Sequence, residues 1–177
     1  MKVINLWGGP GAGKSTTAAG LFFRMKIAHM NVELVHEYAK DLVWDKRFDI
    51  LSNDQLYISA KQNRRLARLI EHDVEWAVTD SPLLLGLLYV NDGRNTTENG
   101  EDFSNFITQK FSEYDNYNIF LNRVKPYVGI GRVQTEDEAK IIDQEVKQLL
   151  DSKGFLYYTV DGDESAPQKI MEILGHV

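Results

Sequence analysis

Short apolar runs alternate along the chain with longer amphipathic stretches. The short runs are rich in β-branched and aromatic residues, which favours buried strands. They are KVINLW (2–7), VELVHE (32–37), WAVTD (76–80), NIFLNR (118–123) and FLYYTV (155–160). The amphipathic stretches predict helices near residues 14–28, 52–74, 101–114, 135–153 and 165–174. Strands that alternate with helices need crossover connections, so we expect an α/β fold in which helices flank a five-stranded parallel sheet.

Two of the predicted helices carry a start signal. Ser52 with Gln55, and Thr135 with Glu138, have the spacing of a capping box. The stretch NDGRNTTENGED (91–102) is a long polar segment that predicts a surface loop. Because the 177 residues contain no repeat, low-complexity tract or linker, we expect a single domain over residues 1–177.

The stretch GGPGAGKS (8–15) joins the first predicted strand to the first predicted helix and fits G-x-x-x-x-G-K-[ST]. Glycines allow positive φ angles, so that consecutive backbone N–H groups can surround an anion at the helix N-terminus. Lys14 is expected along the β- and γ-phosphates of ATP, and the Ser15 hydroxyl on Mg²⁺. The alternative is a glycine-rich turn without a ligand. The residues expected to bind ATP here are Gly9, Gly11, Ala12, Gly13, Lys14, Ser15 and Thr16.

Composition excludes several other kinds of site. The chain has no cysteine, which excludes disulfides, thiolate metal sites and cysteine nucleophiles. Its net charge of −6 gives no general attraction to nucleic acid or acidic membranes. The apolar run at the N-terminus is too short for a signal peptide or a membrane span, so we expect a cytoplasmic protein.

Two carboxylates follow predicted strands. Asp80 ends the third strand, where open α/β sheets bind ligands, and is expected to hold Mg²⁺ or to accept a proton. Glu37 ends the second strand and suits a group that orients a substrate hydroxyl. The alternatives are that Asp80 only caps the next short helix, and that Glu37 is an exposed strand-end residue.

Two arginines flank a glycine-containing segment after the fourth strand, in LNRVKPYVGIGRVQ (121–134). Flexible flanks and mobile arginines predict a small lid at about residues 123–135, in which Arg123 and Arg132 neutralise the transferred phosphoryl group. The alternative is a surface loop with two solvated arginines.

The second predicted helix has a basic face formed by Lys61, Arg64, Arg65 and Arg68. Such a face is ordinarily solvated, although Arg65 or a neighbour could meet an acceptor phosphate. Gln62 projects between this face and the apolar one, and could reach a substrate base or amide. After the last strand, the backbone at Asp161 is expected beside the adenine, unless Asp161 only forms a turn.

The order of several motifs resembles the P-loop nucleoside and nucleotide kinases. The motifs are GGPGAGKST, VHEYAK, SAKQNRRLA, TDSPLLLGLLY, KPYVGIGRVQ and VDGD. The nearest resemblance is to the ribosylnicotinamide kinase-like group of AAA-type ATPases, many of which occur in bacteriophages. It implies a three-layer P-loop NTPase fold and, for a phage-encoded chain, a location in the host cytoplasm.

The resemblance also assigns residues. The acidic residue of its Glu-Tyr-Ala pattern, which contacts the substrate hydroxyl, matches Glu37 and places Tyr38 beside the substrate. The strand-end aspartate matches Asp80, and a glutamine on the preceding helix matches Gln62. Its lid arginines match Arg123 and Arg132. The chain departs from the group at Ser81 and Pro82, where a second aspartate and a threonine are common, so that ribosylnicotinamide is only one of the possible acceptors.

These observations predict an ATP- and Mg²⁺-dependent phosphotransferase. Its acceptor is a deoxynucleoside, a nucleoside monophosphate or a ribosylnicotinamide-like molecule, and neither a membrane nor nucleic acid is an expected partner. Two alternatives stay open. The chain could phosphorylate a hydroxymethylated base in phage DNA, which its basic face would bind, or it could be a regulatory ATPase without a small-molecule acceptor. A homodimer is left open.

Overall fold

Five parallel strands form the centre of the molecule. The computed structural model describes residues 1–90, 100–129 and 134–175. The strands are β1 (Lys2–Trp7), β2 (Val32–Val35), β3 (Trp76–Thr79), β4 (Asp115–Asn122) and β5 (Tyr158–Asp161). They lie in the order β2-β3-β1-β4-β5, and every neighbouring pair is parallel. The predicted sheet is therefore confirmed, and its strands all end at one edge.

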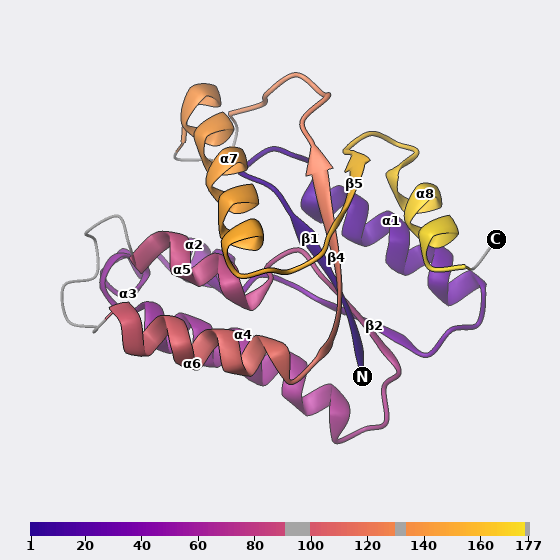
Figure 1. The fold of residues 1–177 in the computed structure, drawn as a ribbon, viewed down its shortest axis with the longest axis horizontal. Coiled ribbons are helices and arrows are strands. Elements are labelled where there is room, and N and C mark those ends of the chain that lie inside the picture. The colour runs from indigo at the N-terminus through magenta and orange to yellow at the C-terminus, as the bar shows by residue number, and fades with distance from the viewer. Residues whose placement is uncertain (91–99, 130–133, 176–177) are drawn as a thin grey trace.

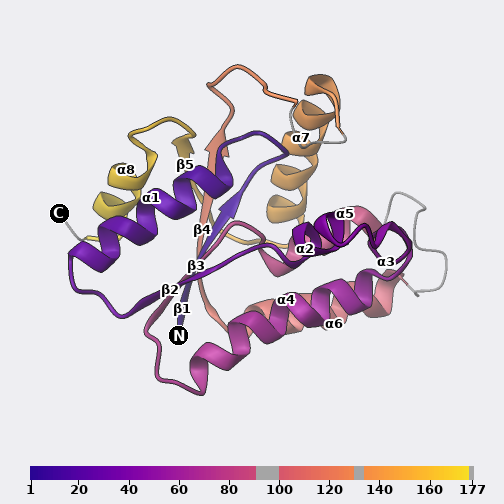
Figure 2. The same ribbon diagram turned by 180° about the vertical axis from the view of Figure 1, so that it is seen from behind.

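Helices cover both faces of this sheet (Figures 1 and 2). They are α1 (Lys14–Ile27), α2 (Tyr38–Trp44), α3 (Phe48–Asn53), α4 (Gln55–Ile70), a 3₁₀ turn η1 (Leu83–Leu85), α5 (Gly86–Val90), α6 (Gly100–Ser112), α7 (Glu136–Ser152) and α8 (Ala166–Ile173). One apolar core joins the sheet to α1 and α8, and a second joins its other face to α4, α5, α6 and α7. This is the expected three-layer arrangement. None of the described helices is long and apolar enough to cross a membrane.

The sequence of β1 explains why it lies in the middle of the sheet. Five of its six residues are buried, and its side chains alternate between the two cores, with Val3 and Trp7 in one and Ile4 and Leu6 in the other. The indole N–H of Trp7 donates to Oδ1 of Asn118 on β4 at 3.0 Å, which satisfies both polar groups inside the core.

The helix predicted over residues 52–74 is wrong at its start. Ser52 and Gln55 do not form a capping box, because Ser52 lies inside α3 and Asp54 is the N-cap of α4. The Asp54 carboxylate accepts from the backbone N–H of Tyr57 at 2.9 Å. Helices α2 and α3 were not predicted from the sequence; they are short, and Leu42 is the one fully buried residue of the two.

Some of the other predicted element boundaries agree with the structure, and others differ from it. The Thr135–Glu138 capping box is confirmed, with both reciprocal hydrogen bonds formed. Strand β4 begins earlier than predicted, and β5 is displaced toward Asp161. Of the polar loop predicted over 91–102, residues 91–99 lie outside the described residues, whereas the last three form the first turn of α6.

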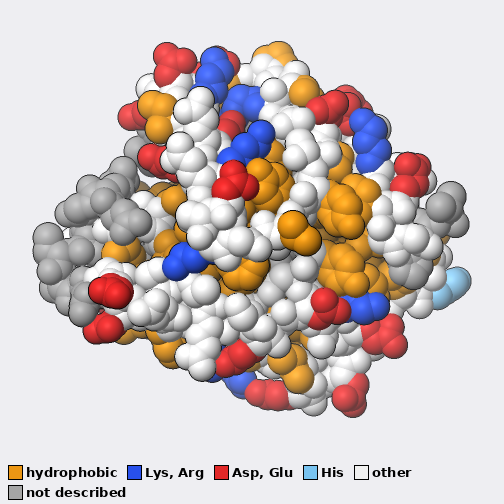
Figure 3. All heavy atoms as spheres, viewed as in Figure 1, with side chains coloured by type: hydrophobic (Ala, Val, Ile, Leu, Met, Phe, Trp, Pro, Cys, Tyr) orange, Lys and Arg blue, Asp and Glu red, His pale blue; other side chains and the backbone are white. Residues whose placement is uncertain are grey.

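The surface over the edge strand β5 is apolar. Figure 3 shows hydrophobic side chains gathered over β5 and between β5 and α8. Leu156 is 92% exposed and Tyr158 is 55% exposed. An exposed edge strand is a common pairing surface, so the oligomeric state left open by the sequence is best examined at this edge.

The turn after β5 packs directly on the loop between β1 and α1. A Cβ atom at Gly162 would overlap the carbonyl oxygen of Ala12 and lie 3.0 Å from that of Asn122. The Gly162 N–H also donates to Asn122 O at 2.9 Å. Only glycine fits between these two backbones.

We therefore predict that Gly162→Ala destabilises the protein by about 1–3 kcal/mol, because backbone must move to admit the methyl group. Chemical denaturation followed by circular dichroism measures this change. Gly100→Ala is the matched control, since its Cβ would meet only Val90 at 3.9 Å. Equal stability of Gly162→Ala and the wild type would contradict the packing described here.

Candidate functional site

The loop from Gly8 to Ser15, called the phosphate loop below, lies at the edge where the strands end. Gly8, Gly11 and Gly13 have φ angles of 140°, 79° and 95°, values that other residues rarely adopt. Gly13 is the N-cap of α1; no side chain among the described residues caps this helix, and its first turn holds no acidic residue. The N–H groups of this helix end are therefore left for another acceptor, and an anion suits them.

Lys14 curls back over the phosphate loop. Its Nζ donates to the carbonyl oxygens of Gly8 at 2.6 Å and Gly9 at 3.0 Å. Desolvation lowers the pKa of the Lys14 ammonium, and the carboxylates of Glu37 and Asp80 oppose this change. The positive charge of Lys14 thus lies inside the site, near the negative charges of Glu37 and Asp80.

Ser15 and Asp80 are in direct contact. The Ser15 hydroxyl donates to Oδ2 of Asp80 at 2.6 Å, and Asp80 is only 6% exposed. Its other oxygen, Oδ1, is buried and has no hydrogen-bond partner among the described residues. A hydroxyl and a carboxylate at this spacing suit Mg²⁺, which is bound by one or two protein oxygens plus phosphates and water. Within the described residues no group of three or more His, Asp or Glu forms an all-protein metal site.

Glu37 lies close to the same charges. The strand β2 ends at Val35, two residues before the predicted end, so Glu37 is the N-cap of α2, and it is half-buried. Desolvation raises the pKa of Glu37; the Lys14 ammonium lowers it, and the Asp80 carboxylate raises it further. The two strand-end carboxylates predicted from the sequence therefore lie in one electrostatic environment.

Helix α4 holds the segment that follows Glu37. Oε1 of Gln62 accepts from the Tyr38 N–H at 2.8 Å, and Gln62 is 4% exposed. Its Nε2 is buried without a partner among the described residues. Arg65 donates to His36 O at 3.0 Å and forms an ion pair with Asp41. The structure thus brings Gln62, Tyr38 and Arg65 together beside Glu37.

The predicted basic face of this helix is divided. Lys61, Arg64 and Arg68 are exposed, whereas Arg65 is turned inward with 25% of its side chain exposed. Arg64 pairs with Glu71 at 2.6 Å. A hollow of about 510 Å³ lies against the inner part of the face, and its lining includes Glu37, Lys40, Trp44, Arg65 and Arg68.

Arg123 approaches the phosphate loop from the end of β4. Its Nε donates to Asp143 Oδ2 at 2.9 Å, and its Cζ lies 5.8 Å from the centre of the Tyr127 ring. Nη1 and Nη2 are buried and have no hydrogen-bond partner among the described residues. Arg132, the other predicted arginine, lies outside the described residues.

Three further residues lie at or near the phosphate loop. Thr16 is exposed in the first turn of α1, and Asp161 accepts from Asn122 Nδ2 at 3.1 Å, directly before the turn that packs on the phosphate loop. Asp143 was not predicted from the sequence; its Oδ1 accepts from Gly9 N–H at 2.5 Å. No local signal marks it, because Asp143 is one of several acidic residues on α7.

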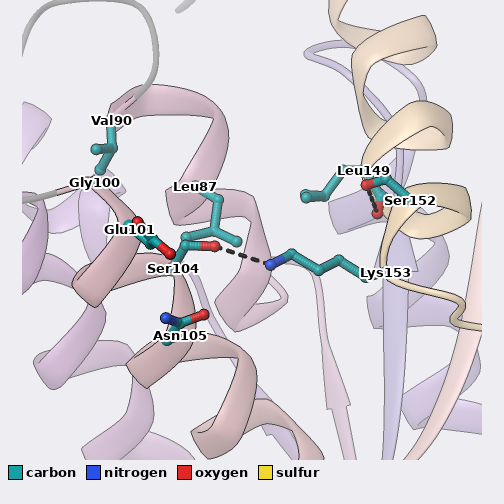
Figure 4. Close-up of a pocket in the computed structure, with 9 residues that line it drawn as sticks. All are labelled: Leu87, Val90, Gly100, Glu101, Ser104, Asn105, Leu149, Ser152 and Lys153. Atoms are coloured by element: carbon teal, nitrogen blue, oxygen red, sulfur yellow. Dashed lines mark hydrogen bonds between the residues drawn. The ribbon is translucent and has the colours of Figure 1, made fainter.

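A separate cavity of about 460 Å³ lies between α5, α6 and the end of α7 (Figure 4). Its lining includes Leu87, Ser104 and Lys153, and Lys153 Nζ donates to Ser104 Oγ at 2.9 Å. None of the predicted site residues lines this cavity, so it is not part of the site at the phosphate loop.

Comparisons with solved structures give the same fold. A NadR protein in complex with NR has a TM-score of 0.74 and 15% identity, over 99% of this chain and 52% of that one. A NadR protein in complex with NAD and AMP-PNP has a TM-score of 0.68 and 15% identity, over 99% and 50%. A deoxyadenosine kinase from M. mycoides with bound dATP has a TM-score of 0.62 and 18% identity, over 99% and 100%. The chain thus spans about half the length of the NadR chains.

Sequence comparison gives the family. A search of curated proteins finds no match. Residues 3–166 match the family model described as an AAA domain, which is most of the chain and includes the phosphate loop, Asp80 and Arg123. The chain therefore belongs to the AAA domain family and has the fold of the P-loop nucleoside kinases.

Proposed function

We propose that the protein transfers the γ-phosphoryl group of ATP, with Mg²⁺, to a hydroxyl group of a nucleoside-like molecule. The observation that carries this proposal is a set of unsatisfied charges around the phosphate loop. Within the part of the chain that the structure describes, Asp80 has a buried oxygen without a hydrogen-bond partner, and Arg123 has two buried nitrogens without one. A metal ion and a polyphosphate are the chemical complements of these two groups.

The donor side would use the phosphate loop. Backbone N–H groups and Lys14 would bind the β- and γ-phosphates, and Ser15 with Asp80 would hold the metal. When bound, Mg²⁺ would neutralise charge on the phosphate oxygens. Arg123 would stabilise the charge that spreads over the transferred group. The backbone near Asp161 would border the adenine.

The acceptor side would use the residues around Glu37. Its carboxylate would orient the attacking hydroxyl and take up its proton. Nε2 of Gln62, which has no hydrogen-bond partner among the described residues, would donate to an acceptor on the base, near Tyr38 and Arg65. The NadR complex with NR and the deoxyadenosine kinase complex with dATP support an acceptor of this class.

The nature of the acceptor is tested by incubating the protein with labelled ATP and a panel of possible acceptors. We expect label on a free nucleoside or nucleotide, with activity changing only modestly between low and physiological salt. Binding to DNA phosphates would instead fall steeply with salt, with a slope of about −0.9 per contact. Label on DNA containing hydroxymethylated bases alone would favour the DNA-kinase alternative, and ATP hydrolysis without any labelled acceptor would favour a regulatory ATPase.

Lys14→Ala is predicted to lower kcat/KM for ATP by about 10²-fold or more, because its charge contacts the phosphates that react. The melting temperature should change by only a few degrees, since Lys14 is not part of the apolar core. Lys26→Ala is the control at the other end of the same helix, where the side chain pairs with Glu33 at 3.0 Å. Normal turnover by a folded Lys14→Ala protein would exclude the phosphate loop from catalysis.

The pH dependence tests Glu37. Because its pKa is raised above the ordinary 4.5, the carboxylate becomes protonated at a higher pH than an exposed glutamate does. We expect kcat/KM for the acceptor to fall as the pH drops through this raised pKa. Glu37→Gln should lower kcat/KM about 10²-fold and abolish this acidic limb.

Two further variants complete this test. Glu33→Gln, on β2 and partly exposed, should leave the pH profile unchanged. Asp80→Asn should mainly raise the Mg²⁺ concentration needed for activity. The division of roles fails if Glu37→Gln and Asp80→Asn give the same pH and Mg²⁺ profiles.

A further inference from the structure

Asp143 is a largely buried carboxylate that the proposed chemistry does not use. It lies on α7, and only 15% of its side chain is exposed. Each of its oxygens accepts one hydrogen bond: Oδ1 from Gly9 N–H at 2.5 Å, and Oδ2 from Arg123 Nε at 2.9 Å. One side chain thus joins α7 to both the phosphate loop and the end of β4.

Only a carboxylate can make both bonds. The two partners are donors, and each meets a different oxygen of the same group. An asparagine in the same place would offer an oxygen to one donor and an NH₂ group to the other, so that one bond would be lost. The charge also matters, because a charge-assisted bond to a guanidinium is about twice as strong as a neutral one.

The contact fixes the direction of Arg123. With Nε held by Asp143, Nη1 and Nη2 have no hydrogen-bond partner among the described residues. A Cβ atom at Gly11 would lie 3.1 Å from Nη1, and one at Gly9 would lie 3.3 Å from Nη2. The free edge of the guanidinium therefore lies against the backbone of the phosphate loop.

We propose that Asp143 is a positioning residue that holds Arg123 over the phosphate loop, so that both Nη groups meet the transferred phosphoryl group. This inference rests on the proposed function. It adds that one side chain of α7 contacts both Gly9 of the phosphate loop and Arg123.

Substitution of Asp143 should lower kcat without weakening the binding of ATP. Its negative charge lies near the expected phosphates, and Arg123 neutralises it. Removal of the charge should therefore leave ATP binding unchanged or slightly tighter. Loss of the orientation of Arg123 should lower kcat, because small errors in position are costly in the transition state.

The kinetic test compares Asp143→Asn, Asp143→Ala and Arg123→Ala with the wild type. Asp143→Asn should lower kcat about 10- to 10²-fold, with KM for ATP changed less than about threefold. The kcat of the double variant Asp143→Ala/Arg123→Ala should lie within about twofold of the kcat of Arg123→Ala, since Asp143 acts through Arg123. Glu145→Gln, an exposed carboxylate on the same helix, should have wild-type kinetics.

A kcat of Asp143→Asn within twofold of the wild type would overturn the proposal. So would full additivity in the double variant, or a rise in KM that accounts for the whole defect. The melting temperature of each variant, measured in parallel, shows whether it keeps the native structure. If Asp143→Ala does not fold, the nearly isosteric Asp143→Asn still tests the proposal.

A measurement independent of turnover separates this proposal from the proposed function. The Gly9 amide proton, observed by NMR, should resonate far downfield in the wild type and move upfield by a large shift in Asp143→Asn but not in Glu145→Gln. If the shift appears but the wild type phosphorylates no acceptor, the proposed function is wrong and the hydrogen bond between Asp143 and Gly9 is still supported. If the Gly9 resonance is the same in Asp143→Asn as in the wild type, that hydrogen bond does not form and the proposal about Asp143 is wrong.

Discussion

Close backbone packing around the phosphate loop is the constraint on which the site depends. Three segments approach the loop so closely that a Cβ atom has no room. The turn at Gly162 contacts Ala12, the carbonyl oxygen of Ala139 lies against Gly9, and the Tyr127 ring lies 3.0 Å from where a Cβ of Gly11 would be. The glycines therefore serve two purposes: they permit the positive φ angles, and they let β5, α7 and the segment after β4 meet at one place.

That meeting point concentrates charges that are only partly satisfied. Lys14 donates to backbone carbonyls, Ser15 to one oxygen of Asp80, and Arg123 to Asp143 through Nε. Counting only residues 1–90, 100–129 and 134–175, the second Asp80 oxygen and the two Nη atoms of Arg123 are buried without a hydrogen-bond partner. Unpaired buried charges are costly in a folded protein, and functional sites are where such a cost is retained. The arrangement is an incomplete ionic network that a metal ion and a polyphosphate would complete.

The sequence predicted the parts of this site that are local in the chain. The phosphate loop is contiguous, so that its glycines, Lys14 and Ser15 could be recognised together. Asp80 and Glu37 could be placed because parallel strands end at one edge of the sheet. The sheet followed from the alternation of apolar runs and amphipathic stretches.

The missed features depend on tertiary contacts or on competition between similar local signals. Asp143 meets Gly9 across 134 residues of sequence, on a helix with many other acidic side chains. The sequence named Arg65 as a candidate contact for an acceptor phosphate, but its inward direction depends on tertiary contacts with His36 O and Asp41. The start of α4 was assigned to Ser52, whereas Asp54 provides the cap two residues later. Both residue types are good N-caps, so the sequence alone did not distinguish them.

We infer that the charges around the phosphate loop bind a metal ion and a triphosphate together. Isothermal titration of the protein with a non-hydrolysable ATP analogue, first with Mg²⁺ and then with excess chelator, separates this joint binding from binding of the triphosphate alone. We expect one analogue molecule to bind per protein and its affinity to fall by at least about tenfold when Mg²⁺ is removed, because the Asp80 carboxylate would then face the phosphates without the metal between them. Absence of binding in the presence of Mg²⁺, or equal affinity with and without Mg²⁺, would show that the charges do not form such a site.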